Sequence, residues 1–161
     1  MFTGDLKKLA KLLKARHLTI STAESCTGGL VASMLTDISG SSDYLNESHV
    51  TYANSAKHKY LNVSNEILEN FGAVSPECAQ AMAEGLQKLS NCDIALCTTG
   101  IAGPTGGTKE KPVGLIYIST RFQGITTVKK YTFNPLLPRK LMKVTFAKAA
   151  IRTALEALKQ S

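Results

Sequence analysis

The chain has 161 residues, a length that suits one domain with its own hydrophobic core. Hydrophobic residues make up 43% of it, but no window reaches the ~18–20 apolar residues of a membrane span, and the N-terminal stretch lacks the features of a signal peptide. The formal net charge of +7 is compatible with binding nucleic acid, with binding a small anion, or with solubility alone. We therefore expect one domain in the cytoplasm, without a membrane partner.

The lysines gather in the two terminal segments, on the polar side of amphipathic patterns, where a solvated helix face is the ordinary explanation. Aromatic residues do not interleave with them as single-strand stacking requires, so no nucleic-acid partner is expected. The cysteines form no C-x-x-C pair and no Cys/His cluster with zinc spacing, and we expect free thiols and no metal or cofactor. They are Cys26, Cys78, Cys92 and Cys97.

The first part of the chain alternates helical and extended patterns. Leucines at helical spacing predict a helix over residues 4–16, and short apolar stretches predict strands over 18–22 and 47–53. Further helices are expected over residues 27–38, 54–60, 64–71 and 75–89. Their signals are Asn54, Ser64 and Ser75 as N-caps, Pro76 in a first turn, and Gly72 as a stop.

The second part begins with a continuous apolar run, residues 93–99, which predicts a buried strand. A glycine-rich loop follows at 100–112, and two strands, 113–121 and 125–133, flank Gln123-Gly124 as a hairpin. A long helix runs from Pro138 to the end, with its inner side expected at Leu141, Val144, Ile151, Leu155 and Leu158. This order predicts a three-layer α/β/α domain with a mixed, mostly parallel sheet of about five strands.

The stretch TAESCTGG, residues 22–29, places two potential nucleophiles, Ser25 and Cys26, after the first strand. Thr27, Gly28 and Gly29 are expected to open a helix, whose free N–H groups can hold an anion or a developing oxyanion. The stretch does not match G-x-S-x-G, so it is not an α/β-hydrolase elbow. A polar turn with a helix cap would explain the same residues.

The stretch VTYANSAK, residues 50–57, places Tyr52 at a strand end and Lys57 in the first turns of a helix. Most lone lysines are solvated surface charges. Few acids are near Lys57, whereas His58 and Lys59 are adjacent, so like charges and partial burial are both expected to lower its pKa. A lysine that is neutral near pH 7 can take a proton from a serine.

The loop TTGIAGPTGGTKEKP, residues 98–112, is neither a Walker A loop nor a dinucleotide-binding G-x-G-x-x-G before a helix. A structural loop is one explanation for its glycines, and close approach of its backbone to a ligand is the one we favour. Thr99 leads into the loop and could hydrogen-bond a catalytic group. The glycines are Gly100, Gly103, Gly106 and Gly107.

Together these segments resemble the C-terminal domain family of CinA, competence/damage-inducible protein A. The matching strings occur in the family's order, and the resemblance covers nearly all of residues 1–161 as a single domain. They are TAESCTGG (22–29), VTYANSAK (50–57), GAVSPE (72–77), TGIAGPTGG (99–107) and KPVG (111–114).

The resemblance implies an amidohydrolase of pyridine nucleotide salvage, which converts nicotinamide mononucleotide (NMN) to nicotinic acid mononucleotide and ammonia without a metal. It implies Ser25 as nucleophile and Lys57 as base, with Tyr52 and Thr99 orienting Lys57 or relaying protons. It also implies a homodimer or a higher homo-oligomer.

Other positions are expected to bind the substrate or the oxyanion. The oxyanion donors are expected among residues 26–29, Cys26 included, and the phosphate against Arg139 or the glycine-rich loop. Relatives commonly carry Gly-Asp-Arg and a second arginine four residues on. This chain has FNPLLPRKLMK, so Arg139 remains and Lys143 replaces the second arginine.

The competing hypothesis is a non-catalytic nucleotide-binding or regulatory module, which would keep the glycine-rich loop but would not need Ser25 and Lys57 to meet. Between the two candidate nucleophiles, a thiol at a helix N-terminus ionises more easily than a hydroxyl. However, no histidine is assigned to Cys26 as a base. We therefore expect its side chain to be a packing residue and only its backbone N–H to act as an oxyanion donor.

Overall fold

One mixed sheet runs through the middle of the protein in the computed structural model, which describes residues 2–161. Its strands are β1 Ile20–Glu24, β2 Leu45–Val50, β3 Ile94–Gly100, β4 Leu115–Phe122 and β5 Ile125–Thr132. They lie in the order β2-β1-β3-β4-β5. β1 pairs in parallel with β2 and β3, and β4 is antiparallel to β3 and β5. Within residues 2–161 all strands but β4 therefore share one direction, which confirms the expected mixed sheet.

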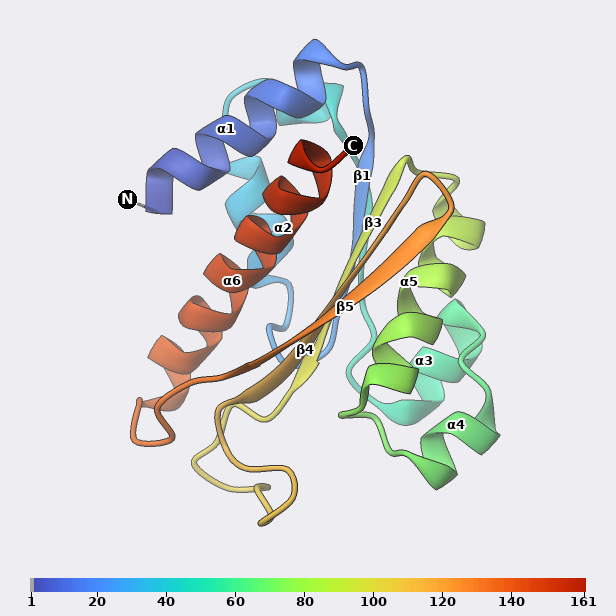
Figure 1. Cartoon of the computed structure of the whole chain (residues 1–161), viewed down its shortest axis with the longest axis vertical. Coiled ribbons are helices and arrows are strands. Elements are labelled where there is room, and N and C mark those ends of the chain that lie inside the picture. The colour runs from blue at the N-terminus through green and yellow to red at the C-terminus, as the bar shows by residue number, and fades with distance from the viewer. Residues whose placement is uncertain (1) are drawn as a thin grey trace.

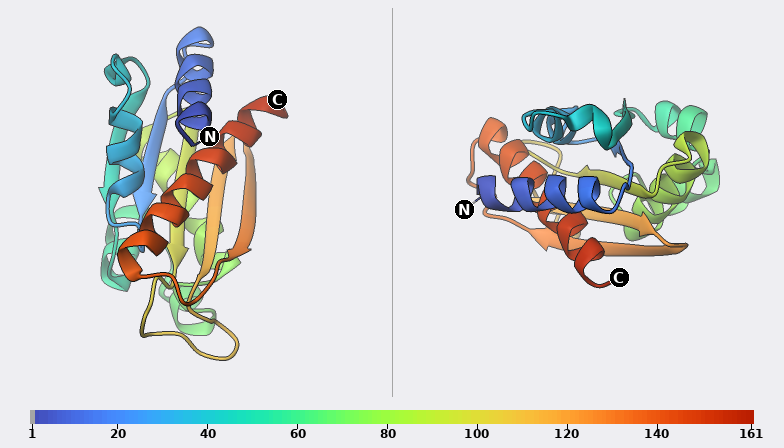
Figure 2. Two further views of the ribbon diagram at one scale, coloured as in Figure 1. Left: turned by 90° about the vertical axis from the view of Figure 1, so that its left-hand side faces the viewer. Right: turned by 90° about the horizontal axis from the view of Figure 1, so that it is seen from above.

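Helices cover both faces of this sheet, as Figures 1 and 2 show. One face carries α1 Phe2–Ala15, α2 Leu30–Thr36 and α6 Arg139–Lys159; the other carries α3 Asn54–Leu61, α4 Asn65–Asn70 and α5 Pro76–Ser90. α5 and α6 pack on the sheet, while α1 packs on α6, and α3 and α4 pack on α5. A short 3-10 helix, Ser41–Asp43, precedes β2. The three-layer α/β/α architecture is confirmed.

Local capping chemistry explains several of the helix starts. Ser64 accepts a hydrogen bond from the N–H of Ile67, and Ser75 accepts one from Cys78 with Pro76 in the first helical position, as predicted. The prediction for Asn54 was wrong. The carbonyl of Ala53 accepts the first helical hydrogen bonds, so Asn54 already lies inside α3.

The first strand begins and ends two residues later than its apolar pattern predicts. The N–H of Thr19 donates to the Asp93 carboxylate, and regular pairing with β2 and β3 starts only at Ile20. The pairing then continues to Glu24, beside Val50 and Thr98. Ser25 therefore comes directly after the last paired residue of β1.

The hydrophobic core lies in two clusters, one on each face of the sheet. On the α6 side the buried positions include Met142 and Phe146, together with the predicted Ile151, Leu155 and Leu158. The prediction was wrong for Leu141, which is 48% exposed, and Val144 is only half-buried. The reason is helical phase: Met142 and Phe146, four residues apart, face the sheet and turn Leu141 outward.

Candidate active site

The three polar segments found in the sequence meet at one edge of the sheet. Ser25 follows β1, Thr51 follows β2, and the glycine-rich loop follows β3. Because these three strands are parallel, their carboxyl ends lie together, where α/β proteins form ligand sites. α3 then returns Lys57 toward the same edge.

Ser25 and Lys57 are in direct contact. Lys57 Nζ lies 3.0 Å from Ser25 Oγ, although 32 positions separate the two residues. The same nitrogen donates to the backbone carbonyls of Thr51 and Tyr52, each at 2.8 Å. Lys57 is fully buried, and Ser25 retains only 9% of its surface. The sheet edge and α3 thus fix the lysine nitrogen against the serine hydroxyl.

Burial lowers the pKa of Lys57 below its usual value, because the charged form loses its hydration. No described carboxylate forms an ion pair with Lys57 to offset this cost. The expectation that like charges contribute was wrong. Lys59 lies over the ring of Tyr60, and His58 hydrogen-bonds the carbonyl of Val63. Desolvation is the cause that lowers this pKa.

These contacts suit a neutral amine. A neutral lysine has two N–H donors and one lone pair. The carbonyls of Thr51 and Tyr52 engage the two donors, which leaves the lone pair facing Ser25 Oγ. In that state the serine hydroxyl donates to Lys57, as a nucleophile does to its base.

The turn after Ser25 differs from the expected helix start. Gly28 and Gly29 have left-handed φ values of 60° and 98°, so α2 begins only at Leu30 and not at Thr27. The buried carboxylate of Glu24 accepts hydrogen bonds from the N–H groups of Val31 and Ala32, and also from the hydroxyl of Thr27. The first N–H groups of α2 are therefore already occupied within the chain.

Fewer oxyanion donors remain than the sequence suggests. The N–H of Gly28 donates to the carbonyl of Ser25, and that of Leu30 donates to Thr27. Within the described residues, the N–H groups of Thr27 and Gly29 have no protein acceptor, and that of Cys26 meets only its own sulfur. These three groups are the N–H donors of the turn that remain available after Ser25.

Cys26 is a buried thiol. Burial raises its pKa to about 12, although a hydrogen bond with Thr98 acts in the opposite direction. The thiol is therefore neutral at physiological pH and is a poor nucleophile.

The role of Glu24 was not predicted from the sequence. The sequence does contain a signal for this role: an acidic residue stands a few positions before the glycine pair and the start of a helix, where a carboxylate can accept hydrogen bonds from the first N–H groups.

Tyr52 and Thr99 do not contact Lys57 in the way that the sequence suggested. The Tyr52 side chain is 58% exposed, and only its backbone carbonyl touches Lys57. The Thr99 hydroxyl donates to the carbonyl of Ala73 at 2.7 Å. This bond ties β3 to the segment before α5, so Thr99 supports the site from outside it.

The glycine-rich loop needs its glycines for its own folding, which is the structural explanation that the sequence also allowed. A Cβ at Gly100 would lie 2.6 Å from the carbonyl oxygen of Leu115, and one at Gly107 would lie 2.8 Å from the nitrogen of Val113. Gly103 and Gly106 have left-handed φ values of 74° and 90°. The chain packs the loop onto the start of β4.

Two basic residues of α6 reach the site region. Arg139 donates to the carbonyl of Gly103 at 2.7 Å and to the hydroxyl of Tyr52 at 3.0 Å. The Lys143 nitrogen lies beside Gly28, 3.6 Å from the position that a Cβ would take there. Arg139 therefore joins the glycine-rich loop to Tyr52, and Lys143 lies beside the turn that follows Ser25.

Comparison with known families decides the membership of this chain. Residues 5–159 match the model of the CinA C-terminal domain. The chain belongs to the CinA C-terminal domain family.

Relatives of this CinA C-terminal domain are longer proteins. It is 55% identical over 125 residues to a putative competence-damage inducible protein of Clostridium perfringens, a match that covers 78% of this chain and 30% of that protein. A CinA-like protein of Syntrophomonas wolfei is 52% identical over 146 residues, 91% of this chain and 35% of that protein. The chain thus spans about a third of the length of these curated relatives.

Solved structures share the fold of this CinA C-terminal domain over its full length. A CinA superfamily protein of Klebsiella pneumoniae superposes with a TM-score of 0.94 at 29% identity, covering 100% of this chain and 99% of that one. The competence/damage inducible protein CihA of Agrobacterium tumefaciens gives 0.90 at 40% identity, covering 99% and 98%. These matches support the described fold independently of the sequence pattern.

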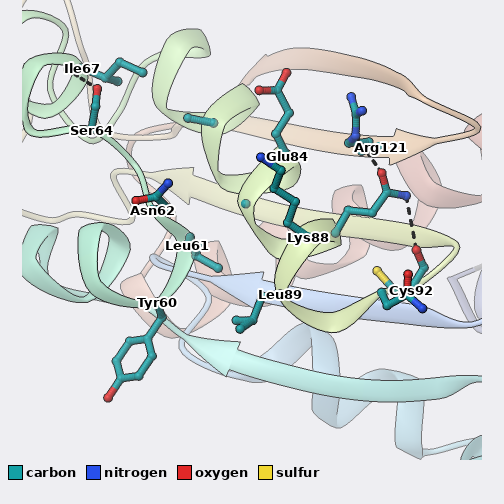
Figure 3. Close-up of a pocket in the computed structure, with 14 residues that line it drawn as sticks. Tyr60, Leu61, Asn62, Ser64, Ile67, Glu84, Lys88, Leu89, Cys92 and Arg121 are labelled. Carbon is teal, nitrogen blue, oxygen red and sulfur yellow. Dashed lines mark hydrogen bonds between the residues drawn. The ribbon is translucent and has the colours of Figure 1, made fainter.

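One surface hollow of the domain lies away from Ser25 and Lys57. It has a volume of about 1040 Å³ and is lined by α3, α5 and the segments that follow them, with Tyr60, Lys88 and Arg121 among the side chains that Figure 3 labels. None of the site residues predicted from the sequence lines it. The size of a hollow therefore does not locate the site in this domain.

Neither a metal-ligand cluster nor a membrane-spanning helix occurs among the described residues. Across residues 2–161, no three His, Cys, Asp or Glu side chains gather as potential metal ligands. In the same part of the chain, none of the helices has the length and hydrophobicity to cross a bilayer.

Proposed function

We propose that this CinA C-terminal domain is an amidohydrolase that converts NMN to nicotinic acid mononucleotide and ammonia. The observation that carries the proposal is the contact of 3.0 Å between the buried Lys57 nitrogen and Ser25 Oγ. NMN as substrate rests on the resemblance of the site strings to those of the deamidases of this family. The names of the matched relatives state no substrate.

The first step is acylation of the serine. Neutral Lys57 takes the proton of the Ser25 hydroxyl while Oγ forms a bond to the carboxamide carbon of NMN. The carbonyl oxygen becomes an oxyanion, which the unpaired N–H groups of Thr27 and Gly29 would stabilise. The C–N bond then breaks, and protonated Lys57 gives its proton to the leaving nitrogen, which departs as ammonia.

The second step releases the product. Lys57 is neutral again and takes a proton from a water molecule, whose oxygen attacks the Ser25 ester. The ester bond breaks, Ser25 Oγ recovers its proton from Lys57, and nicotinic acid mononucleotide leaves. One lysine thus serves as base and acid in both halves, and the net reaction is amide plus water to carboxylic acid plus ammonia.

The contacts of Lys57 favour an enzyme over a non-catalytic binding module. A fully buried lysine without a carboxylate partner lowers the stability of the folded protein. A binding module gains nothing from directing this nitrogen at a serine. An enzyme does gain, because the same burial keeps the amine neutral and basic.

The test is ammonia release from NMN, nicotinamide riboside, nicotinamide and glutamine, each with the wild-type domain and with Ser25→Ala. We expect turnover of NMN that Ser25→Ala abolishes and that survives exhaustive chelation. Ammonia release from none of the four amides would contradict the proposal. Activity lost on chelation and restored only by a divalent ion would contradict the metal-free mechanism.

A further inference from the structure

One buried hydroxyl at the candidate site takes no part in the resting contacts of Ser25 and Lys57. Thr51 follows β2 and is only 1% exposed, and its Oγ1 has no hydrogen-bond partner among the described residues. We propose that Thr51 Oγ1 binds the water molecule that hydrolyses the Ser25 ester and so releases the product. This inference rests on the proposed function.

The fold places the Thr51 side chain beside Ser25. Regular pairing of β2 with β1 ends one residue before each of them. The Val50 side chain lies 3.6 Å from the position that a Cβ would take at Gly29, on the α2 side of the sheet. Side chains alternate along a strand, so Thr51 points to the opposite side, where Lys57 meets Ser25. Neighbouring strands lie about 4.8 Å apart, so one small molecule can contact both side chains.

The backbone of Thr51 holds the base of the proposed reaction. Its carbonyl accepts a hydrogen bond from Lys57 Nζ at 2.8 Å. Because the carbonyl and the hydroxyl belong to one residue, a water bound to Oγ1 also lies near the Lys57 nitrogen. A hydroxyl accepts a hydrogen bond without adding a charge. A carboxylate in its place would favour the ammonium form of Lys57 and so remove the base.

The other hydroxyls near this edge of the sheet form hydrogen bonds within the chain. Their partners are as follows: Thr27 with Glu24 and Thr98, Thr99 with Ala73, and Tyr52 with Arg139. An unpaired buried hydroxyl does not by itself indicate a site, because Ser21 and Thr22 inside β1 also lack a partner. Thr51 differs from these two because it directly contacts the base.

Deacylation needs a second group that orients the attacking water. In the acyl-enzyme the Lys57 lone pair no longer meets a serine hydroxyl, so it can take one proton of a water molecule. The other O–H of that water donates to Thr51 Oγ1. The water oxygen bonds to the acyl carbon, the bond from that carbon to Ser25 Oγ breaks, and Lys57 returns the proton to Oγ. Thr51 keeps its own proton throughout.

Loss of this contact should affect the second step more than the first. The carboxamide nitrogen reaches the site as part of the bound substrate, whereas the water is held only by its own hydrogen bonds. Damage to the pair formed by Ser25 and Lys57 would instead slow both steps. The two steps therefore distinguish a water-binding role of Thr51 from a structural one.

The first experiment measures deacylation with p-nitrophenyl acetate, an activated ester that acetylates a reactive serine whatever the natural substrate is. Loss of the burst in Ser25→Ala identifies the acetylated residue. In Thr51→Val, hydrolysis of the acetyl-Ser25 ester should be about tenfold slower or more, as expected for the loss of one hydrogen bond in a buried site. Thr51→Ser should restore most of the rate. Thr22→Val, the same substitution at a buried and unpaired threonine of β1, should leave the rate unchanged.

The second experiment uses NMN and separates the two steps. The value of kcat/KM contains only the steps up to ammonia release, so in Thr51→Val it should stay within about threefold of the wild type. Acyl-Ser25 should meanwhile accumulate, as measured by intact mass spectrometry of the quenched protein.

The outcomes of the two experiments distinguish this inference from the proposed function. Slow hydrolysis of acetyl-Ser25 in Thr51→Val, in a protein that does not deamidate NMN, would support the water site while the proposed function fails. An unchanged hydrolysis rate in Thr51→Val, or a kcat/KM that falls as far as that rate, would overturn the inference. So would the absence of acyl-Ser25 in the wild type with both reagents.

Discussion

Gly85 of α5 contacts the backbone carbonyl of Leu61 at the end of α3, and no larger residue fits between the two helices. A Cβ at Gly85 would overlap that carbonyl oxygen. Because α3 also carries Lys57, this crossing sets how far the Lys57 nitrogen reaches toward the sheet edge.

Gly85→Ala should therefore lower the free energy of unfolding by about 2–4 kcal/mol, because one of the two helices must shift. The same shift should move Lys57 away from Ser25 and reduce ammonia release. Urea denaturation and the NMN assay measure the two effects. Gly4→Ala in α1 is the matched control: nothing lies within 4 Å of its new Cβ, so stability should rise by up to ~1 kcal/mol. A Gly85→Ala variant as stable as the wild type would refute the close crossing.

Ser25→Ala and Lys57→Met should each reduce kcat for NMN by about 10³-fold or more, because each removes one member of the reacting pair. Lys57→Met should leave the protein folded, since removing a buried amine offsets the loss of the donor that meets the Thr51 and Tyr52 carbonyls. Circular dichroism and urea denaturation provide the folding control. Should Lys57→Met unfold the protein, Lys57 would have to be reassigned as a structural residue.

The lowered pKa of Lys57 predicts two pH dependences with the same sign. In the proposed mechanism the neutral amine is the base, so kcat/KM should rise with pH through this pKa. Between the lowered folded value and the ordinary unfolded value, the unfolded chain binds more protons, so stability should also rise with pH. The free energy of unfolding of Lys57→Met minus that of the wild type should accordingly decrease as the pH rises. Urea titrations of both proteins from about pH 6 to pH 10 test this, and a difference that grows with pH would contradict it.

Cys26→Ala should leave kcat for NMN within about threefold of the wild type, since a thiol with a pKa of about 12 is protonated at neutral pH. Iodoacetamide should react slowly with the folded protein for the same reason. The comparison is with Ser25→Ala in the same assay. If Cys26→Ala abolished ammonia release and Ser25→Ala retained it, the assignment of the nucleophile would reverse.

Glu24→Gln should destabilise the fold by about 2–4 kcal/mol, because an amide replaces one of two acceptor oxygens that meet the N–H groups of α2. Activity should fall as well, since the turn that carries the oxyanion donors is held by this carboxylate. Glu69→Gln, at an exposed position of α4, controls for the change of charge and should stay within about 0.5 kcal/mol. Equal urea midpoints for the two variants would disprove the structural role of Glu24.

Features that depend on neighbouring residues were readable from the sequence. The caps at Ser64 and Ser75 use N–H groups three residues away. The hairpin turn at Gln123-Gly124 requires two left-handed residues, with φ of 53° and 77°, and the sequence provides glycine at one of them. The alternation of strand and helix patterns along the chain predicted a sheet between two helical layers. Each of these signals acts over one or two turns of chain, so local chemistry is sufficient to predict it.

The tertiary structure decided what the side chains at the sheet edge do. Ser25, Lys57 and Arg139 could each be named as site residues, but whether they meet, and which partners they choose, depends on chain segments far apart in sequence. Packing buries Lys57 completely and so changes its pKa, whereas its sequence neighbours His58 and Lys59 turn to other partners. Packing also brings the first N–H groups of α2 into hydrogen bonds with the Glu24 carboxylate. It places the Arg139 guanidinium where it donates to the Gly103 carbonyl and the Tyr52 hydroxyl. The sequence by itself determined the elements and the chemical groups at their ends; the desolvation and pairing of those groups arise only when the packed layers bring them together.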